Sequence, residues 1–150
     1  MIDLAEILPA ALPAAVAWAE AQAARGQALG APLTPGQADD ARAVGVAQPE
    51  RIRIVTTAVL PFPDTPSLAA IARDTGLLSP GTIGLTLGHA VFVVEEHVTR
   101  RLLTHEFRHV HQYEAAGSIG AFLARYLHEI ATFGYVDAPL EADARQHERG

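Results

Sequence analysis

The sequence predicts an α+β fold in which a small sheet packs against several helices. Residues 51–60 are rich in β-branched residues and begin with Arg51 and Arg53 alternating with Ile52 and Ile54, which is the period of a strand with one solvated face. Two further runs rich in β-branched residues, 82–87 and 90–95, are separated only by Gly88-His89. The remaining third of the chain has helical spacing of its apolar residues. We therefore expect a roughly three-stranded antiparallel or mixed sheet with helices before and after it.

The first third of the chain predicts two helices. Residues 10–29 are rich in alanine, which favours a helix that ends near Gly26 or Gly30. A second, shorter helix is expected over residues 35–46, with Thr34 as its N-cap.

The middle of the chain predicts the sheet and one short helix. After the strand at 51–60, the sequence "PFPDTP" stops extended pairing, and residues 65–76 have helical spacing. The strands 82–87 and 90–95 then follow each other closely enough to form a hairpin with a tight turn.

The last third predicts three helices separated by glycines. Gly117 and Gly134 divide it into helices at about 97–116, 118–133 and 138–148. The N-caps expected for the second and third are Ser118 and Asp137.

Composition limits the classes of function. With 150 residues, of which 49% are hydrophobic, the chain can form one domain with a substantial core. The formal net charge of −6 gives no electrostatic footprint for nucleic acid, so we expect no nucleic-acid partner. Because the chain has no cysteine, any metal must be bound by His, Asp and Glu.

The N-terminal sequence gives a prediction about location. Its first residues are acidic rather than basic, and Glu6, Glu20 and two prolines interrupt its apolar stretch. We therefore expect neither a signal peptide nor a membrane span, and we predict a cytoplasmic protein without a membrane partner.

The segment "HEFRH", residues 105–109, carries the clearest chemical signal. On a helix His105 and His109 lie one above the other, so both imidazoles can bind one ion. Glu106 is turned about 100° round the helix, from where its carboxylate can reach water on the metal. The opposite side of this helix is apolar, as the motif requires: Leu103, Phe107 and Val110.

A catalytic zinc usually has three protein ligands, so a third must come from elsewhere in the chain. The best candidate is Glu141, thirty-two positions after His109 in "GYVDAPLEADAR". The helix at 118–133 would reverse the chain and bring the last helix back beside the first. His128 and His147 stay open as alternative ligands.

With "HEFRH" followed at this distance by a glutamate on a later helix, the chain resembles the gluzincin group of zinc metallopeptidases, and in size its compact minigluzincins. Residues 80–148 are also similar to uncharacterised bacterial domains described as metallopeptidases. The resemblance implies that His105, His109 and Glu141 bind Zn²⁺ and that Glu106 activates the water. It also implies that the strand "AVFVVEE" lies along the substrate as an antiparallel edge.

The chain departs from thermolysin-like members near the third ligand. Position 145 is arginine where those proteins have aspartate, and Asp143 can take the supporting role instead. The chain is also too short for their large C-terminal helical subdomain, so we expect a shallow cleft. A donor for the tetrahedral oxyanion is still needed. Tyr135 ranks first, ahead of Tyr126 and Arg145, because it lies in the loop before Glu141.

Three functional hypotheses follow. The first is a zinc-dependent metalloendopeptidase-like hydrolase that acts on a peptide or protein. The second is a regulatory or interaction module whose zinc is structural, and the third is a helical interaction domain without metal. We divide the chain into a zincin-like catalytic core at 49–150 and an N-terminal helical segment at 1–48, which can cover the cleft as a latency segment.

Overall fold

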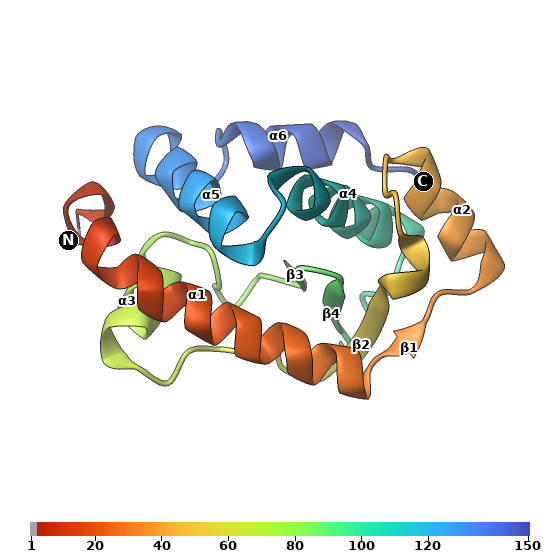
Figure 1. Ribbon diagram of the computed structural model, residues 1–150, viewed down its shortest axis with the longest axis horizontal. Coiled ribbons are helices and arrows are strands. Elements are labelled where there is room, and N and C mark those ends of the chain that lie inside the picture. The colour runs from red at the N-terminus through yellow and green to blue at the C-terminus, as the bar shows by residue number, and fades with distance from the viewer. Residues whose placement is uncertain (1–2) are drawn as a thin grey trace.

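The structure is a computed structural model that describes residues 3–150. It confirms the α+β class: within these residues, six α-helices surround one mixed four-stranded sheet (Figure 1). The helices are α1 (Leu4–Leu29), α2 (Pro35–Ala43), α3 (Pro66–Asp74), α4 (Arg100–Ala116), α5 (Ile119–Phe133) and α6 (Pro139–Gln146). The strands are β1 (Ala31–Pro32), β2 (Arg53–Thr57), β3 (Gly84–Leu87) and β4 (Ala90–Val94), and a single 3-10 turn spans Pro49–Arg51.

The expected elements are present, and their boundaries differ for local reasons. α1 begins six residues before the predicted start, because the Asp3 side chain accepts a hydrogen bond from the Ala5 amide and caps it. α4 begins at Arg100 rather than residue 97, where the Thr99 hydroxyl accepts from the Leu102 amide. The prediction of Asp137 as an N-cap was wrong. Pro139 holds the first position of α6, so Ala138 is the N-cap.

The sheet has the order β1-β2-β4-β3. β2 pairs with β4 in parallel, and the chain crosses between them through α3 and β3. β3 and β4 form the predicted hairpin around Gly88 and His89. The expectation that "AVFVVEE" forms an edge was wrong: β4 is an inner strand, and the antiparallel edge is β3. β4 suits the inner position because every residue of Ala90–Val94 is apolar, so both faces of the strand can be buried.

The two faces of the sheet are covered by different helices (Figure 1). On one face α4 and α2 pack on β2 and β4 through the cluster Val44, Ile52, Val91, Val93, Phe107 and Val110. On the other face α1 packs through the cluster Ala19, Ala23, Leu87, Ala90 and Phe92. Gly26 allows this contact, because a Cβ there would lie only 2.7 Å from Cβ of Ala90. The sheet is therefore the middle layer of three.

α1, which makes up much of the predicted N-terminal segment, packs against the rest of the fold. Its first half packs with α3 and α5 in a cluster that includes Leu4, Leu68, Ile71 and Ile130. α1 is long and apolar enough to cross a membrane, but signal sequences and core helices of soluble proteins meet the same two criteria. A cytoplasmic location therefore stays a prediction.

Candidate metal centre

α4 places the two histidines of the motif on one side of a well-anchored helix. Its apolar side, which includes the fully buried Phe107 and Val110, packs on the sheet. This orientation directs His105 and His109 away from the sheet core and toward α6. Gly117 ends the helix where the sequence predicted.

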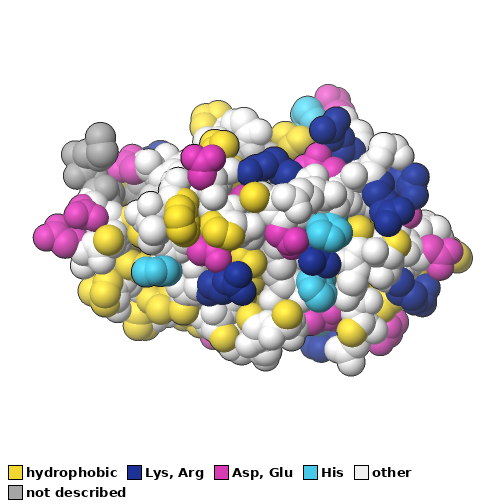
Figure 2. Space-filling view, turned by 90° about the horizontal axis from the view of Figure 1, so that it is seen from above, with side chains coloured by type: hydrophobic (Ala, Val, Ile, Leu, Met, Phe, Trp, Pro, Cys, Tyr) yellow, Lys and Arg dark blue, Asp and Glu magenta, His cyan; other side chains and the backbone are white. Residues whose placement is uncertain are grey.

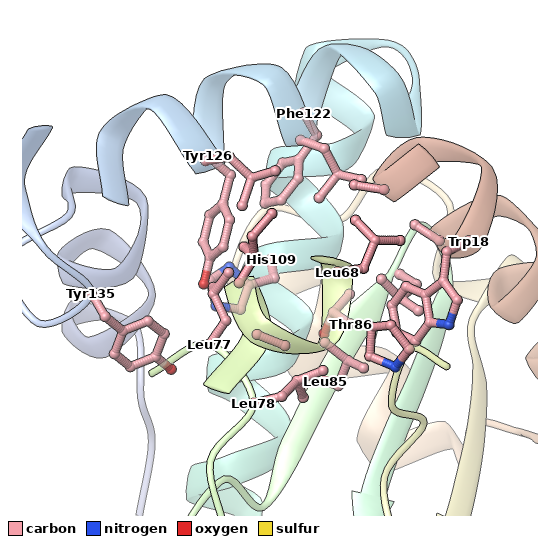
Figure 3. A pocket seen from close by; sticks show the side chains of 18 of the residues that line it. Trp18, Leu68, Leu77, Leu78, Leu85, Thr86, His109, Phe122, Tyr126 and Tyr135 are labelled. Carbon is pink, nitrogen blue, oxygen red and sulfur yellow. The ribbon is translucent and has the colours of Figure 1, made fainter. Parts of the chain in front are cut away.

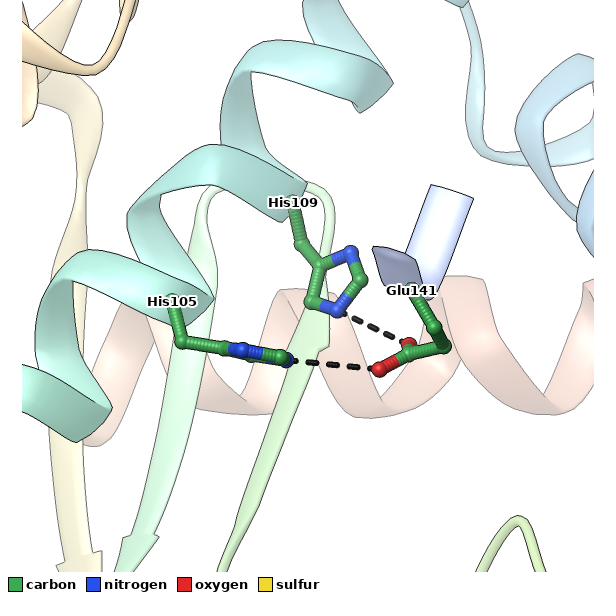
Figure 4. A group of neighbouring side chains, drawn as sticks. All are labelled: His105, His109 and Glu141. Carbon is green, nitrogen blue, oxygen red and sulfur yellow. Dashed lines mark ion pairs between the residues drawn. The ribbon is translucent and has the colours of Figure 1, made fainter. Parts of the chain in front are cut away.

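Glu141 of α6 faces both histidines, so the structure brings together the three predicted ligands (Figure 4). Nε2 of His109 lies 2.9 Å from Oε2 of Glu141, and Nε2 of His105 lies 3.3 Å from Oε1. Ligand atoms placed tetrahedrally at about 2.0–2.1 Å from an ion would lie roughly 3.3 Å apart. The N,N,O donor set and this spacing fit zinc. Within residues 3–150 this is the sole group of three or more such side chains close enough to share an ion.

The two histidines and Glu141 shift one another's pKa values. Burial lowers the pKa of His109, but the hydrogen bond from its ring to Glu141 and the charge of Glu141 outweigh this and raise the pKa to about 9. The pKa of His105 is also raised, because Glu141 and Glu106 outweigh the effect of its burial. Burial opposes ionisation of Glu141, yet hydrogen bonds from both histidines hold its pKa well below its usual range. His109 and Glu141 thus face each other as a buried pair of opposite charge.

His105 has a supporting carboxylate that the sequence did not reveal. Its Nδ1 lies 2.8 Å from Oε2 of Glu148, which follows the end of α6. The other oxygen of Glu148 accepts from Nε of Arg101 at 2.8 Å. A carboxylate on Nδ1 fixes the proton there and leaves Nε2 with its lone pair toward the metal position. No spacing signal in the sequence marks this residue, because it lies on irregular chain.

His109 is held by an amide and, beyond it, by Asp143. Its Nδ1 lies 2.8 Å from Oε1 of Gln112. The Gln112 amide nitrogen donates to the Leu140 carbonyl and to Asp143, both at 2.9 Å, so its oxygen must face the histidine. Asp143 therefore connects to His109 through Gln112, and its supporting role stays a prediction. Asp143 is itself anchored by Arg108, whose Nε donates to it at 2.7 Å.

Glu106 lies beside the three ligands without replacing any of them. Its Oε2 is 3.9 Å from Nε2 of His105, and its Oε1 accepts a 2.8 Å hydrogen bond from the buried Thr86 hydroxyl. The absence of a side chain at Gly84 permits this position, because a Cβ there would lie 3.1 Å from the carboxylate. The edge strand thus orients the carboxylate that the motif offers as a base.

The three candidate oxyanion donors have different positions. The Tyr126 hydroxyl donates to Oε2 of Glu141 at 2.8 Å, so it supports a ligand. Arg145 extends away, where it donates to the Val136 carbonyl. Tyr135 lines the cavity beside the ligands, and burial raises the pKa of its hydroxyl, which keeps its proton.

The remaining histidines discussed as ligands or turn residues lie outside the cluster of His105, His109 and Glu141. His111 donates through Nδ1 to the Gly45 carbonyl, and His147 donates to the Asp143 carbonyl. His128 is exposed on α5. His89 does more than form a turn, since its Nε2 is 3.0 Å from Glu114, a carboxylate that also accepts the amides of residues 47 and 48.

A cavity of about 140 Å³ opens beside the ligands (Figure 3). His109, Tyr126 and Tyr135 lie toward one end, and Trp18 and Leu68 lie at the other. Most of its wall is apolar and comes from α1, α3, β3 and α5. On the outer surface, arginine and acidic side chains lie beside one another on the face seen in Figure 2.

Comparisons with known proteins give no relative from which a role could be transferred. No protein-family model matches the chain, and neither curated proteins nor solved structures give a significant match.

Proposed function

We propose that the protein is a zinc-dependent hydrolase of peptide bonds, built on a minimal zincin-like core as the gluzincin resemblance implies. The observation that carries the proposal is the convergence of His105, His109 and Glu141 at ion-binding spacing, with the carboxylate of Glu106 beside them. The adjoining cavity gives a substrate room to approach this group.

The ligands and their neighbours define what each residue would do. Zinc held there would polarise a substrate carbonyl and lower the pKa of a bound water to about 7. Glu106, fixed by Thr86, takes the proton of the attacking water and passes it to the leaving amine. Tyr135 would donate a hydrogen bond from its hydroxyl to the oxyanion. Glu148 and Gln112 keep the two imidazoles in the tautomer that metal binding requires.

The first experiment is elemental analysis of protein purified without an affinity tag or added metal. We expect about one zinc per chain in the wild type and reduced zinc in His109→Ala and Glu141→Ala. Protein that is metal-free and cannot be reconstituted would exclude the proposal.

The second experiment separates catalysis from a structural zinc in a regulatory or interaction module. Glu106→Gln should keep its zinc and lose peptide cleavage, whereas Glu95→Gln, at an exposed glutamate, should keep both. If cleavage by Glu106→Gln equals that of the wild type, Glu106 is not the base. If the zinc-loaded wild type cleaves no peptide bond, the interaction module becomes the better account of the site.

A further inference from the structure

Two aromatic side chains of α5 lie beside the candidate metal centre, one helical turn apart (Figure 3). Phe122 and Tyr126 are separated by four positions, so they lie on the same side of the helix. Their rings stack with centroids 5.3 Å apart, and Phe122 also stacks on Tyr113 of α4, with centroids 3.8 Å apart. The three rings form an aromatic column that fixes the direction of the Tyr126 hydroxyl.

The hydroxyls at the two ends of this column have different acceptors. The Tyr113 hydroxyl donates to the Thr86 carbonyl at 3.1 Å, which belongs to β3. The Tyr126 hydroxyl donates to Oε2 of Glu141 at 2.8 Å. A hydrogen bond to a charged acceptor is stronger than one between neutral groups. Of the two tyrosines, Tyr126 is therefore the one that acts directly on a predicted ligand.

The two oxygens of Glu141 are not equivalent, although the whole side chain is buried. Oε2 accepts from Tyr126 and lies 2.9 Å from Nε2 of His109. Oε1 lies 3.3 Å from Nε2 of His105, which is the spacing expected for two atoms that share a zinc ion. The hydrogen bond from the phenol restrains Oε2 and draws electron density from it, so Oε2 is the poorer ligand atom. Oε1 is the oxygen left for an ion.

From these contacts we infer that Tyr126 is a positioning residue that limits Glu141 to binding the metal through one oxygen, Oε1. The inference rests on the proposed function for the presence of the metal. With the two histidines, Oε1 completes three ligand atoms and leaves the fourth position of a four-coordinate ion open to water or substrate. A phenol has one proton to donate. Because Tyr126 gives it to Glu141, this residue is not the oxyanion donor.

The test replaces zinc by Co²⁺, whose visible absorption per bound ion is strong with four ligand atoms and weaker with five. Tyr126→Phe removes one oxygen atom and keeps the ring in the column. Oε2 of Glu141 then becomes free to bind, so this variant should lose absorption intensity per bound Co²⁺.

The matched control is Tyr113→Phe, which removes the same atom from the same column. Its hydroxyl donates to a backbone carbonyl rather than to a ligand, so this variant should keep the wild-type spectrum.

A second variant reaches the same hydroxyl through the packing of its ring. Phe122→Leu keeps both tyrosine hydroxyls but removes the ring stacked between them, so it should lose less intensity than Tyr126→Phe. Far-UV circular dichroism checks that each variant keeps its helices. If Tyr126→Phe does not fold, a wild-type spectrum in Phe122→Leu overturns the inference.

The outcomes separate this inference from the proposed function. Equal spectra for the wild type and Tyr126→Phe, or the same loss in Tyr113→Phe, would overturn the inference alone. Wild type that binds no Co²⁺ would overturn both the inference and the proposed metal centre. If Tyr126→Phe alone loses intensity but zinc-loaded wild type cleaves no peptide bond, the proposed hydrolysis is wrong while the role of Tyr126 stands.

Discussion

Removal of the carboxylate of Glu148 should weaken zinc binding, although this residue is not a ligand. The 2.8 Å contact between Glu148 and Nδ1 of His105 fixes which ring nitrogen carries the proton. Without this contact the His105 ring can rotate, and its proton can move to Nε2. Part of the free energy of zinc binding is then used to restore the tautomer that binds zinc. Loss of such a partner typically reduces metal affinity by about 10–100-fold, or about 1.4–2.8 kcal/mol.

Two substitutions grade the effect. Glu148→Ala removes the acceptor, so the full loss is expected. Glu148→Gln keeps a neutral acceptor oxygen, so its affinity should lie between those of Glu148→Ala and the wild type. Competition with a chromophoric chelator at pH 7 measures the dissociation constants.

A matched control separates this role from the general attachment of α4. Asp40→Asn weakens the 2.9 Å pair between Asp40 and Arg100, which also lies on α4 but contacts no ligand. Its zinc affinity should equal that of the wild type. If Glu148→Ala also binds zinc as tightly as the wild type, the positioning role of Glu148 is refuted.

Three other measurements address the charges and the core. Because the pKa of His109 is raised to about 9, zinc must displace a proton from this ring at neutral pH. The affinity for zinc should therefore rise about tenfold per pH unit for each proton displaced, and calorimetry in buffers of different ionisation enthalpy counts those protons. Burial raises the pKa of Glu114, but hydrogen bonds from two backbone amides and from His89 outweigh this and hold the pKa below its usual value of 4.5. The stabilisation by this carboxylate is thus fully present above that pH and lost as pH falls through the lowered pKa. Glu114→Gln should reduce the free energy of unfolding by about 1–3 kcal/mol at pH 7 and by less at pH 3, and an equal loss at both pH values in urea titrations would contradict this. Phe107→Ala should cost about 3–5 kcal/mol, since its side chain is fully buried; a loss below about 1 kcal/mol would show that the core cluster is wrongly assigned.

The sequence predicted the elements well because their signals are local. Helix periodicity, Thr34 and Ser118 as caps, and the glycines after α4 and α5 each depend on residues within one or two turns. The alignment of His105 and His109 on one side of α4 follows from helix geometry in the same way.

The errors concern long-range pairing. Periodicity cannot tell which strand lies at the edge of a sheet, so β4 was expected where β3 stands. β1, with two residues, is too short to show a period and was not predicted. The role of Glu148 depends on irregular chain returning to His105, a contact between residues 43 positions apart.

The order in which the candidate centre is synthesised has a consequence for its assembly. Both histidines belong to α4, while Glu141, Asp143 and Glu148 all come later in the chain. A growing chain therefore displays a two-histidine helix before Glu141 and Glu148 exist, and two histidines alone make an incomplete site for zinc. Folding from the N-terminus would place α1 and the sheet first. Under the proposed function, metal acquisition would be a late event that follows the docking of α6, so a chain stalled before that point would carry the motif without a closed centre.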